Sequence, residues 1–334
     1  MSFLKLCAIG TALVVVVGCS DKRFTESKSF AGVTTEERHT VSAETLNLGY
    51  EQYMLNCYAC HGEDGDGKGP AAAYLRPPPR DFRQGLFKFG GVSAGELPHN
   101  EDLIRLVTRG LTGTALLPWD LPDESLRAIV EYIKLFSESP TGEEDDTYSH
   151  RWQDPDNELG ERITASEDPW KGKEKAAVIR GDKVYHATAQ CSRCHPAYST
   201  KQEIAAYNKE LLDMDTAQFG ADMYRSFLRD SDYGVKILPI DFLYHDIKTL
   251  HPDDNQSEQL KQLYLTIGAG IGGTAMPAWK GSLSEEDLWA LAYYVQSIYA
   301  KKDTKEAYAM RDALQNQPAF VPAQPSADTD TAIQ

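Results

Sequence analysis

The feature that most constrains this chain is a pair of Cys-x-x-Cys-His motifs. Residues 57–61 read Cys-Tyr-Ala-Cys-His, and residues 191–195 read Cys-Ser-Arg-Cys-His. This spacing suits covalent attachment of haem c, because two thiols add to the two vinyl groups on one porphyrin edge and the next imidazole reaches the iron. The sequence therefore predicts two covalently bound haem c groups, with thioethers from Cys57, Cys60, Cys191 and Cys194 and iron ligands from His61 and His195.

Two other uses of a Cys-x-x-Cys pair fit less well. A redox-active dithiol would be expected beside a β-α-β pattern, and the sequence shows no such pattern. A zinc site usually pairs two such knuckles at short separation, whereas Cys57 and Cys191 are 134 residues apart. Both copies also carry His at the same position, which favours haem attachment.

The two halves of the chain resemble each other beyond these motifs. Residues 103–116 align with residues 263–276 without a gap, which indicates an internal repeat. Each half also ends in an apolar stripe at helical spacing, over residues 126–136 and 288–298. We expect both stripes to pack across the first helix of their own half. The other matching pairs are Gly49 and Gly181, Tyr53 and Tyr185, Asp81-Phe82 and Asp241-Phe242, Trp119 and Trp279, and Tyr132 and Tyr294.

Taken together, these motifs resemble tandem class I cytochromes c. The resemblance covers about residues 44–138 and 174–300 and includes the Gly-Thr-Ala-Met-Pro loop at 273–277. It implies an all-α fold class, with two class I cytochrome c domains in tandem, each a small helical fold around one haem. In that family the loop methionine is the sixth iron ligand, so Met276 is expected opposite His195. A His/Met pair raises the reduction potential of a haem.

The first half departs from the family pattern at the sixth ligand. Leu116 stands where the methionine is expected, and leucine cannot bind iron. Three outcomes follow: a five-coordinate iron with an open apolar distal face, a bound water, or another side chain as ligand. His99 is one candidate ligand, although a surface or helix-capping role is favoured for it; the other candidates are Met54, which should lie on the proximal side, Met214 and Met223.

Contacts to the haem propionates follow from the same resemblance. Trp119 and Trp279 come just after the ligand loops, where the family often packs an aromatic residue against a propionate. An indole N–H donates such a bond. Arg80, just before Asp81-Phe82, is a candidate ion-pair partner for a propionate. Ordinary packing or surface roles remain open for all three.

The N-terminus resembles a bacterial lipoprotein signal. Lys5 precedes an apolar run, and Val16-Val17-Gly18-Cys19 resembles a lipobox. A run of about 12 apolar residues is too short for a membrane span, which needs ~20. We therefore expect a signal peptide over 1–18, lipid on Cys19, and a protein anchored in the cell envelope that faces the periplasm or the outside. The sequence leaves inner or outer membrane open.

The sequence also suggests the order of the segments. After the signal we expect a flexible tether over 19–43, a first cytochrome c domain over 44–138, an acidic linker over 139–173 and a second domain over 174–302. A C-terminal helix end and disordered tail would occupy 303–334. The second domain contains an inserted segment at about 202–233, which should form a helix or two that packs on the domain or docks a partner.

Charge bounds the choice of partners. The net charge of −16 disfavours nucleic acid as a partner and fits either a basic protein partner or a simple role in solubility. The expected function is that of a lipid-anchored carrier of single electrons between membrane-linked and periplasmic redox proteins, such as a respiratory complex or a periplasmic oxidoreductase, and not of an enzyme. The alternative is a dihaem peroxidase-like or gas-binding enzyme that uses an open first haem. Peroxide cleavage needs a distal acid–base group, which residues 116–118 do not offer.

Overall fold

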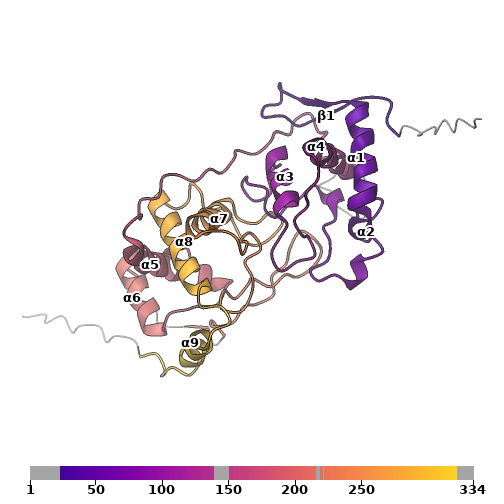
Figure 1. The fold of residues 1–334 in the computed structure, drawn as a ribbon. Coiled ribbons are helices and arrows are strands. Elements are labelled where there is room, and N and C mark those ends of the chain that lie inside the picture. Colours follow the sequence, from indigo (N-terminus) through magenta and orange to yellow (C-terminus); the bar gives the residue numbers. More distant parts are fainter. Residues whose placement is uncertain (1–22, 139–149, 216–218, 221, 322–334) are drawn as a thin grey trace, which may run out of the picture.

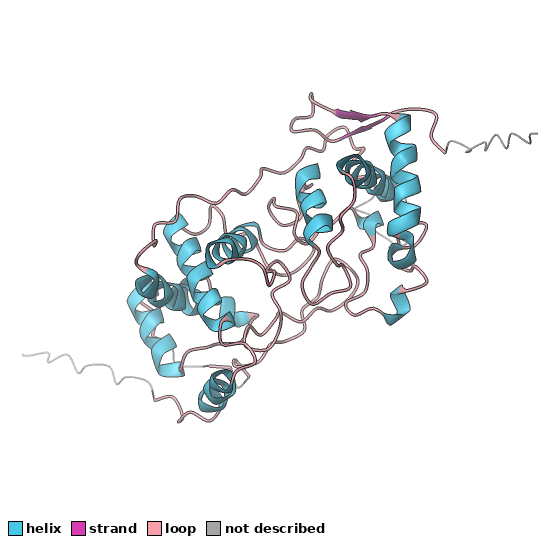
Figure 2. Cartoon of the chain, viewed as in Figure 1, coloured by secondary structure: helices cyan, strands magenta, loops and turns pink. Residues whose placement is uncertain are grey.

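The structure is a computed structural model that describes residues 23–138, 150–215, 219–220 and 222–321. Two helical units lie side by side, and their loops meet between them (Figure 1). Helices make up most of the regular secondary structure in the described chain, which also has long loops and one short strand pair near its start (Figure 2). None of the described helices is long and apolar enough to cross a bilayer.

The first unit contains four α-helices and an antiparallel strand pair among the described residues. Its elements are β1 (Lys28–Phe30), β2 (His39–Val41), α1 (Ala43–Asn56), α2 (Tyr58–His61), α3 (Asn100–Arg109) and α4 (Asp123–Lys134), with short 3-10 turns at Ala72–Tyr74, Phe82–Gln84 and Leu135–Glu138. The second unit contains α5 (Glu174–Lys183), a π-helical turn (Val184–Thr188), a 3-10 turn (Cys191–Arg193), α6 (Lys201–Leu212), α7 (Gln256–Ala269), α8 (Glu285–Tyr299) and α9 (Lys305–Gln315).

In both units the first helix crosses the closing helix at a glycine. The prediction of this packing is confirmed, because α1 lies against α4 and α5 against α8. A Cβ atom on Gly49 would overlap the carbonyl oxygen of Ala128, and one on Gly181 would overlap that of Ala290. Glycine therefore lets the two backbones approach closely. Beside each crossing a tyrosine pair packs with ring centroids 5.3 Å apart in the first unit and 5.4 Å apart in the second.

Residues 23–42 differ from the flexible tether that the sequence predicts. β1 and β2 pair in register there, with Phe30 and Val41 buried in the first core. The His39 ring lies 2.8 Å from the Glu131 carboxylate of α4, which ties the hairpin to the helix. Phe24 and Asn47 of α1 exchange hydrogen bonds of 3.0 and 2.9 Å. A few apolar side chains among many polar ones were enough to order this segment.

The described part of the acidic linker is attached to both units. Trp152 is fully buried in the first core, and the Gly160 N–H donates to the Leu97 carbonyl at 2.9 Å. Further along, the Tyr293 hydroxyl of α8 donates to Asp168 at 2.7 Å. Residues 139–149 of the predicted linker lie outside the described residues.

The C-terminal region differs from the predicted helix end and tail. Residues 305–315 form a separate helix, α9, with Arg311 and Leu314 buried. Leu314 joins Ile204 of α6 and Tyr224 in a small apolar cluster, so the inserted segment forms the expected helix and packs on α9. The predicted signal peptide, Cys19 and residues 322–334 lie outside the described residues.

The two units meet through a pair of reciprocal backbone hydrogen bonds. The Thr112 N–H donates to the Lys248 carbonyl at 3.0 Å, and the Gly272 N–H donates to the Lys88 carbonyl at 3.2 Å. Residues 112 and 272, like 88 and 248, are related by the same 160-residue offset as the sequence repeat. A contact in which the same two surfaces meet in both directions has twofold, isologous character. The second unit is thus docked on the first as a near-symmetric copy.

The glycine crossings make a direct prediction about stability. Gly49→Ala and Gly181→Ala each force a methyl group into a backbone carbonyl, so each should destabilise its unit by about 1–3 kcal/mol. Thermal unfolding of the purified protein measures this. Gly220→Ala is the matched control, because its added methyl group meets no atom within 4 Å. Equal stability of all three variants would contradict the close helix crossing.

Candidate functional site

Each Cys-x-x-Cys-His motif is wound into a single helical turn. The His61 N–H donates to the Cys57 carbonyl at 2.9 Å, and the His195 N–H donates to the Cys191 carbonyl at 3.0 Å. This winding brings both thiols and the imidazole of each motif close together. Burial, with the neighbouring Cys60 as a smaller cause, raises the pKa of Cys57 to about 12, and burial raises that of Cys191 to about 12. Such protonated thiols are poor redox nucleophiles, which argues against a dithiol site.

Both histidines are oriented by the same backbone contact. The Nδ1 atom of His61 lies 3.1 Å from the Arg80 carbonyl oxygen, and that of His195 lies 2.8 Å from the Ile240 carbonyl oxygen. A carbonyl only accepts, so Nδ1 carries the proton and Nε2 keeps its lone pair for a metal. Burial lowers the pKa of both imidazoles, which keeps them neutral as iron ligation requires.

One stacked phenylalanine fixes the plane of each imidazole. Phe82 stacks on His61 with centroids 4.4 Å apart and planes 18° apart, and Phe242 stacks on His195 at 5.0 Å and 19°. These two phenylalanines belong to the Asp-Phe pairs that correspond in the sequence repeat. A tyrosine hydroxyl also donates to the carbonyl of the residue after each histidine, at 2.7 Å in the first unit and 2.9 Å in the second.

The two ligand loops have the same backbone conformation. In the first unit the Leu111 N–H donates to the Leu116 carbonyl at 2.8 Å, and in the second the Ile271 N–H donates to the Met276 carbonyl at 3.1 Å. The Leu116 N–H donates to the Thr114 hydroxyl oxygen at 3.1 Å, and the Met276 N–H donates to the Thr274 hydroxyl oxygen at 3.2 Å. Leu116 and Met276 are both half-buried. The first unit has therefore changed the residue at this position and kept the loop.

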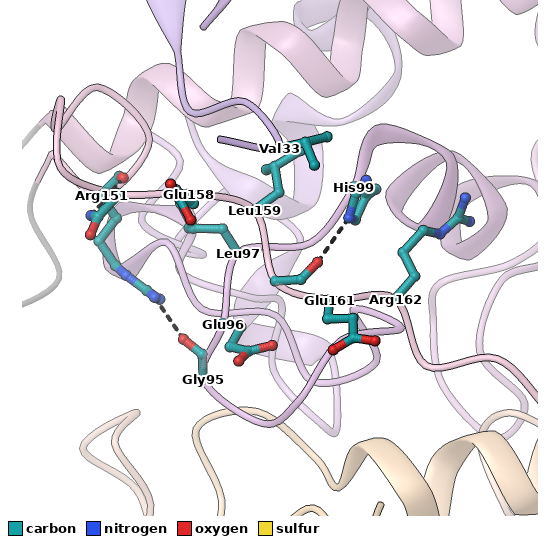
Figure 3. Close-up of a pocket in the computed structure, with 12 residues that line it drawn as sticks. Val33, Gly95, Glu96, Leu97, His99, Arg151, Glu158, Leu159, Glu161 and Arg162 are labelled. Atoms are coloured by element: carbon teal, nitrogen blue, oxygen red, sulfur yellow. Dashed lines mark hydrogen bonds between the residues drawn. The ribbon is translucent and has the colours of Figure 1, made fainter. Parts of the chain in front are cut away.

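His99 lies at the start of α3, in a surface pocket between the linker and the first unit (Figure 3). Its Nε2 atom lies 2.9 Å from the Gly160 carbonyl oxygen, so the nitrogen that would bind iron donates to the linker. Met54 lies on α1, half-buried at the edge of the first core. Met214 is 54% exposed, and Met223 packs on the cluster around Leu314 in the second unit.

A group of cations lies where the two units meet. The Arg80 guanidinium is 3.5 Å from the ring centroid of Tyr233, a residue of the inserted segment, and the Lys88 ammonium is 5.4 Å from it. Burial, with the charges of Arg80 and Lys248, lowers the pKa of Lys88 to about 8. Burial and Arg80 also lower the pKa of Lys248. A half-buried excess of positive charge in an acidic protein fits anionic groups such as haem propionates.

The sequence interpretation missed Lys88 and Lys248, although the repeat held a signal for them. They correspond at the same 160-residue offset as the ligand loops, six residues after Phe82 and Phe242. Of the predicted propionate contacts, Arg80 belongs to this cation group. Trp279 packs against the second core, and Trp119 is 37% exposed.

The arrangement fits haem c in both units, and comparisons with known proteins agree. The family model for cytochrome c matches residues 46–136, and the model for cytochrome c oxidase, cbb3-type, subunit III matches residues 176–295. A search of curated proteins gave no match. Among solved structures, a chain of the reducing HAO-like protein complex of Kuenenia stuttgartiensis is similar, with 25% identity and a TM-score of 0.52 over 75% of this chain and 95% of that chain.

The matches extend over both halves of the repeat, and each contains one of the Cys-x-x-Cys-His motifs with its oriented histidine. The predicted fold class is thereby confirmed. The chain carries two cytochrome c domains in tandem and is a dihaem c-type cytochrome.

Proposed function

We propose that the protein carries single electrons between redox partners in the cell envelope. The observation that supports this most is the proximal arrangement, built twice from the same parts: an imidazole fixed by a backbone carbonyl and a stacked phenylalanine. Haem, when bound, supplies reversible one-electron chemistry at iron. A carrier needs little more from the protein than rigid ligands and shielding from water.

Met276 is the proposed sixth ligand of the second haem. The Met276 backbone is held in its loop by two hydrogen bonds, one from the Ile271 N–H to its carbonyl and one from its own N–H to Thr274 Oγ1. A His/Met pair raises the reduction potential, which makes the second haem the higher-potential centre.

The first haem is proposed to have an open, apolar distal side. Leu116 takes the place of the ligand in an unchanged loop, and the His99 Nε2–H is already used by the Gly160 carbonyl. A haem with one protein ligand has a lower potential than a His/Met haem. Electrons would then pass from the first haem to the second.

Arg80, Lys88 and Lys248 are proposed to neutralise the propionates of the two haems. The three cations lie where the units meet: Arg80 and Lys88 lie over the Tyr233 ring, and the charge of Arg80 acts on Lys248. Each unit contributes a lysine at the corresponding position, so this arrangement would direct the propionate edges of both haems toward the interface. Trp119 and Trp279 follow the ligand loops and are proposed as further propionate donors.

The partners are proposed to be redox proteins, either a respiratory complex or a periplasmic oxidoreductase. One support is the similar chain in the reducing HAO-like protein complex. The other is the net charge of −16, which favours docking on a basic surface of a partner protein. Lipid on Cys19 would hold the protein at a membrane, in reach of membrane-linked donors.

A redox titration tests the carrier function and the role of Met276 together. The native protein should show two one-electron steps at different potentials. Met276→Leu makes the second loop like the first, so it should lower the upper step toward the lower one. Spectroelectrochemistry with a haem count follows this. A single step in the native protein would contradict the carrier proposal, and an unchanged upper step in the variant would exclude Met276 as a ligand.

Carbon monoxide tests the open distal side of the first haem. The reduced protein should bind one carbon monoxide, and Leu116→Met should abolish that binding by filling the sixth position. Absorbance titration measures the stoichiometry, and Leu117→Met is the matched control at the exposed neighbouring residue. No binding by the native protein would mean that another side chain already ligates the first iron. Peroxide turnover by the native protein would favour the enzyme alternative.

Removal of the interface lysines should lower both haem potentials. Lys88→Met with Lys248→Met takes away positive charge that favours the ferrous state, and the half-buried location reduces screening. Lys68→Met with Lys236→Met removes the same charge from side chains that are 76% and 62% exposed and should leave both potentials nearly unchanged. Equal shifts in the two proteins would show that the lysines act only through net charge.

A further inference from the structure

The second unit has a helix for which the first unit shows no counterpart among its described residues. α9 follows the closing helix α8 and lies against the second unit (Figure 1). It carries a buried arginine, Arg311, whose residue is 7% exposed. The guanidinium donates to the Ala197 carbonyl at 3.2 Å, to the Tyr224 carbonyl at 2.9 Å and to the Asp241 carboxylate at 2.7 Å. A fork of donors held at three points is fixed in place.

The Asp241 carboxylate connects this arginine to the proximal side of the second haem site. It accepts from the Tyr198 hydroxyl at 2.9 Å and from the Leu243 N–H at 3.1 Å. The Tyr198 hydroxyl in turn accepts the Phe242 N–H at 2.8 Å. This network therefore holds residues 241–243. These residues directly follow Ile240, whose carbonyl oxygen accepts the hydrogen bond from the His195 imidazole.

The first unit orients its histidine with weaker and more local means. Asp81 pairs with Arg83, two residues further along the same chain segment, at 3.0 and 2.7 Å. Both side chains are partly exposed, at 26% and 18%. The corresponding contact from His61 is 3.1 Å, against 2.8 Å from His195. The Asp-Phe motif is thus shared by both units, and the distant arginine belongs to the second.

We infer that Arg311 is a positioning residue for the second haem. Through Asp241 it fixes the segment that orients the His195 imidazole, and its buried charge offsets that of the aspartate beside the haem site. The inference rests on the proposed function only in that residues 191–195 hold a haem. It assigns to α9 a role in setting the potential of the second haem independently of the first.

The direction of the effect follows from electrostatics. Without Arg311, Asp241 is a buried carboxylate with no cation partner, and removal of one member of a buried pair leaves an uncompensated charge. Negative charge near the iron stabilises the ferric state, so the potential falls. A loosened Ile240 carbonyl also weakens the fixed orientation of the ligand imidazole.

The experiment compares four variants in the full-length holoprotein by spectroelectrochemical titration of each haem and by EPR of the ferric form. Arg311→Met should lower the potential of the second haem, leave that of the first unchanged and alter the low-spin signal of the second. Arg311→Lys keeps the charge and should restore part of the shift. Arg311→Met combined with Asp241→Asn removes both charges and should return the potential toward the native value. Leu314→Ala loosens α9 packing but keeps Arg311, and should shift neither potential.

Three results would overturn the inference. These are an unchanged second potential in Arg311→Met with both haems present, an equal fall in Leu314→Ala, or no recovery in the double variant. The haem count and the titration of the native protein distinguish failure of the inference about Arg311 from failure of the proposed function. A native protein with fewer than two haems refutes the dihaem carrier itself, whereas two haems with a silent Arg311→Met refute only the role of Arg311.

Discussion

The hydrogen bond from an imidazole N–H to a main-chain carbonyl is the constraint on which both domains depend. It fixes the tautomer of His61 and His195, so that Nε2 is left for iron, and it ties each ligand to a segment far along the chain. The surrounding structure holds the two partners of that hydrogen bond in place. Helix pairs cross at a glycine to bring the motif near the segment, and a stacked phenylalanine on the same segment keeps the ring from turning.

Much of this arrangement could be predicted because the same residues recur in both halves of the sequence. The Cys-x-x-Cys-His motifs, the glycine and tyrosine of the first helix, the Asp-Phe pair and the apolar stripe of the closing helix keep their spacing in both halves. Repetition separates a packing requirement from chance, so the mostly helical fold, the helix crossing and the matching loop at Leu116 were predictable. The carbonyl and the stacked phenylalanine that contact each imidazole orient it as haem ligation requires.

Elements that occur once could not be predicted in this way. The hairpin over residues 28–41 rests on isolated apolar side chains such as Phe30, which a polar segment hides. α9 has no counterpart among the described residues of the first unit, and its role depends on Arg311 contacts with residues 70 to 114 positions away. Lys88 and Lys248 do recur at the repeat offset, but their meeting at the interface depends on how the two units dock. Long-range partners of single polar residues leave no local pattern in a sequence.

The reciprocal contact between the units has a consequence for how the two haem sites can differ. It joins main-chain atoms, the N–H groups of Thr112 and Gly272 to the carbonyls of Lys248 and Lys88, so it does not depend on the side chains of Leu116 and Met276. In a symmetric dimer of separate chains a change from methionine to leucine would alter both sites at once. With both halves in one polypeptide, the pairing persists while each loop varies alone, and a protein with twofold contacts can hold two unequal electron sites.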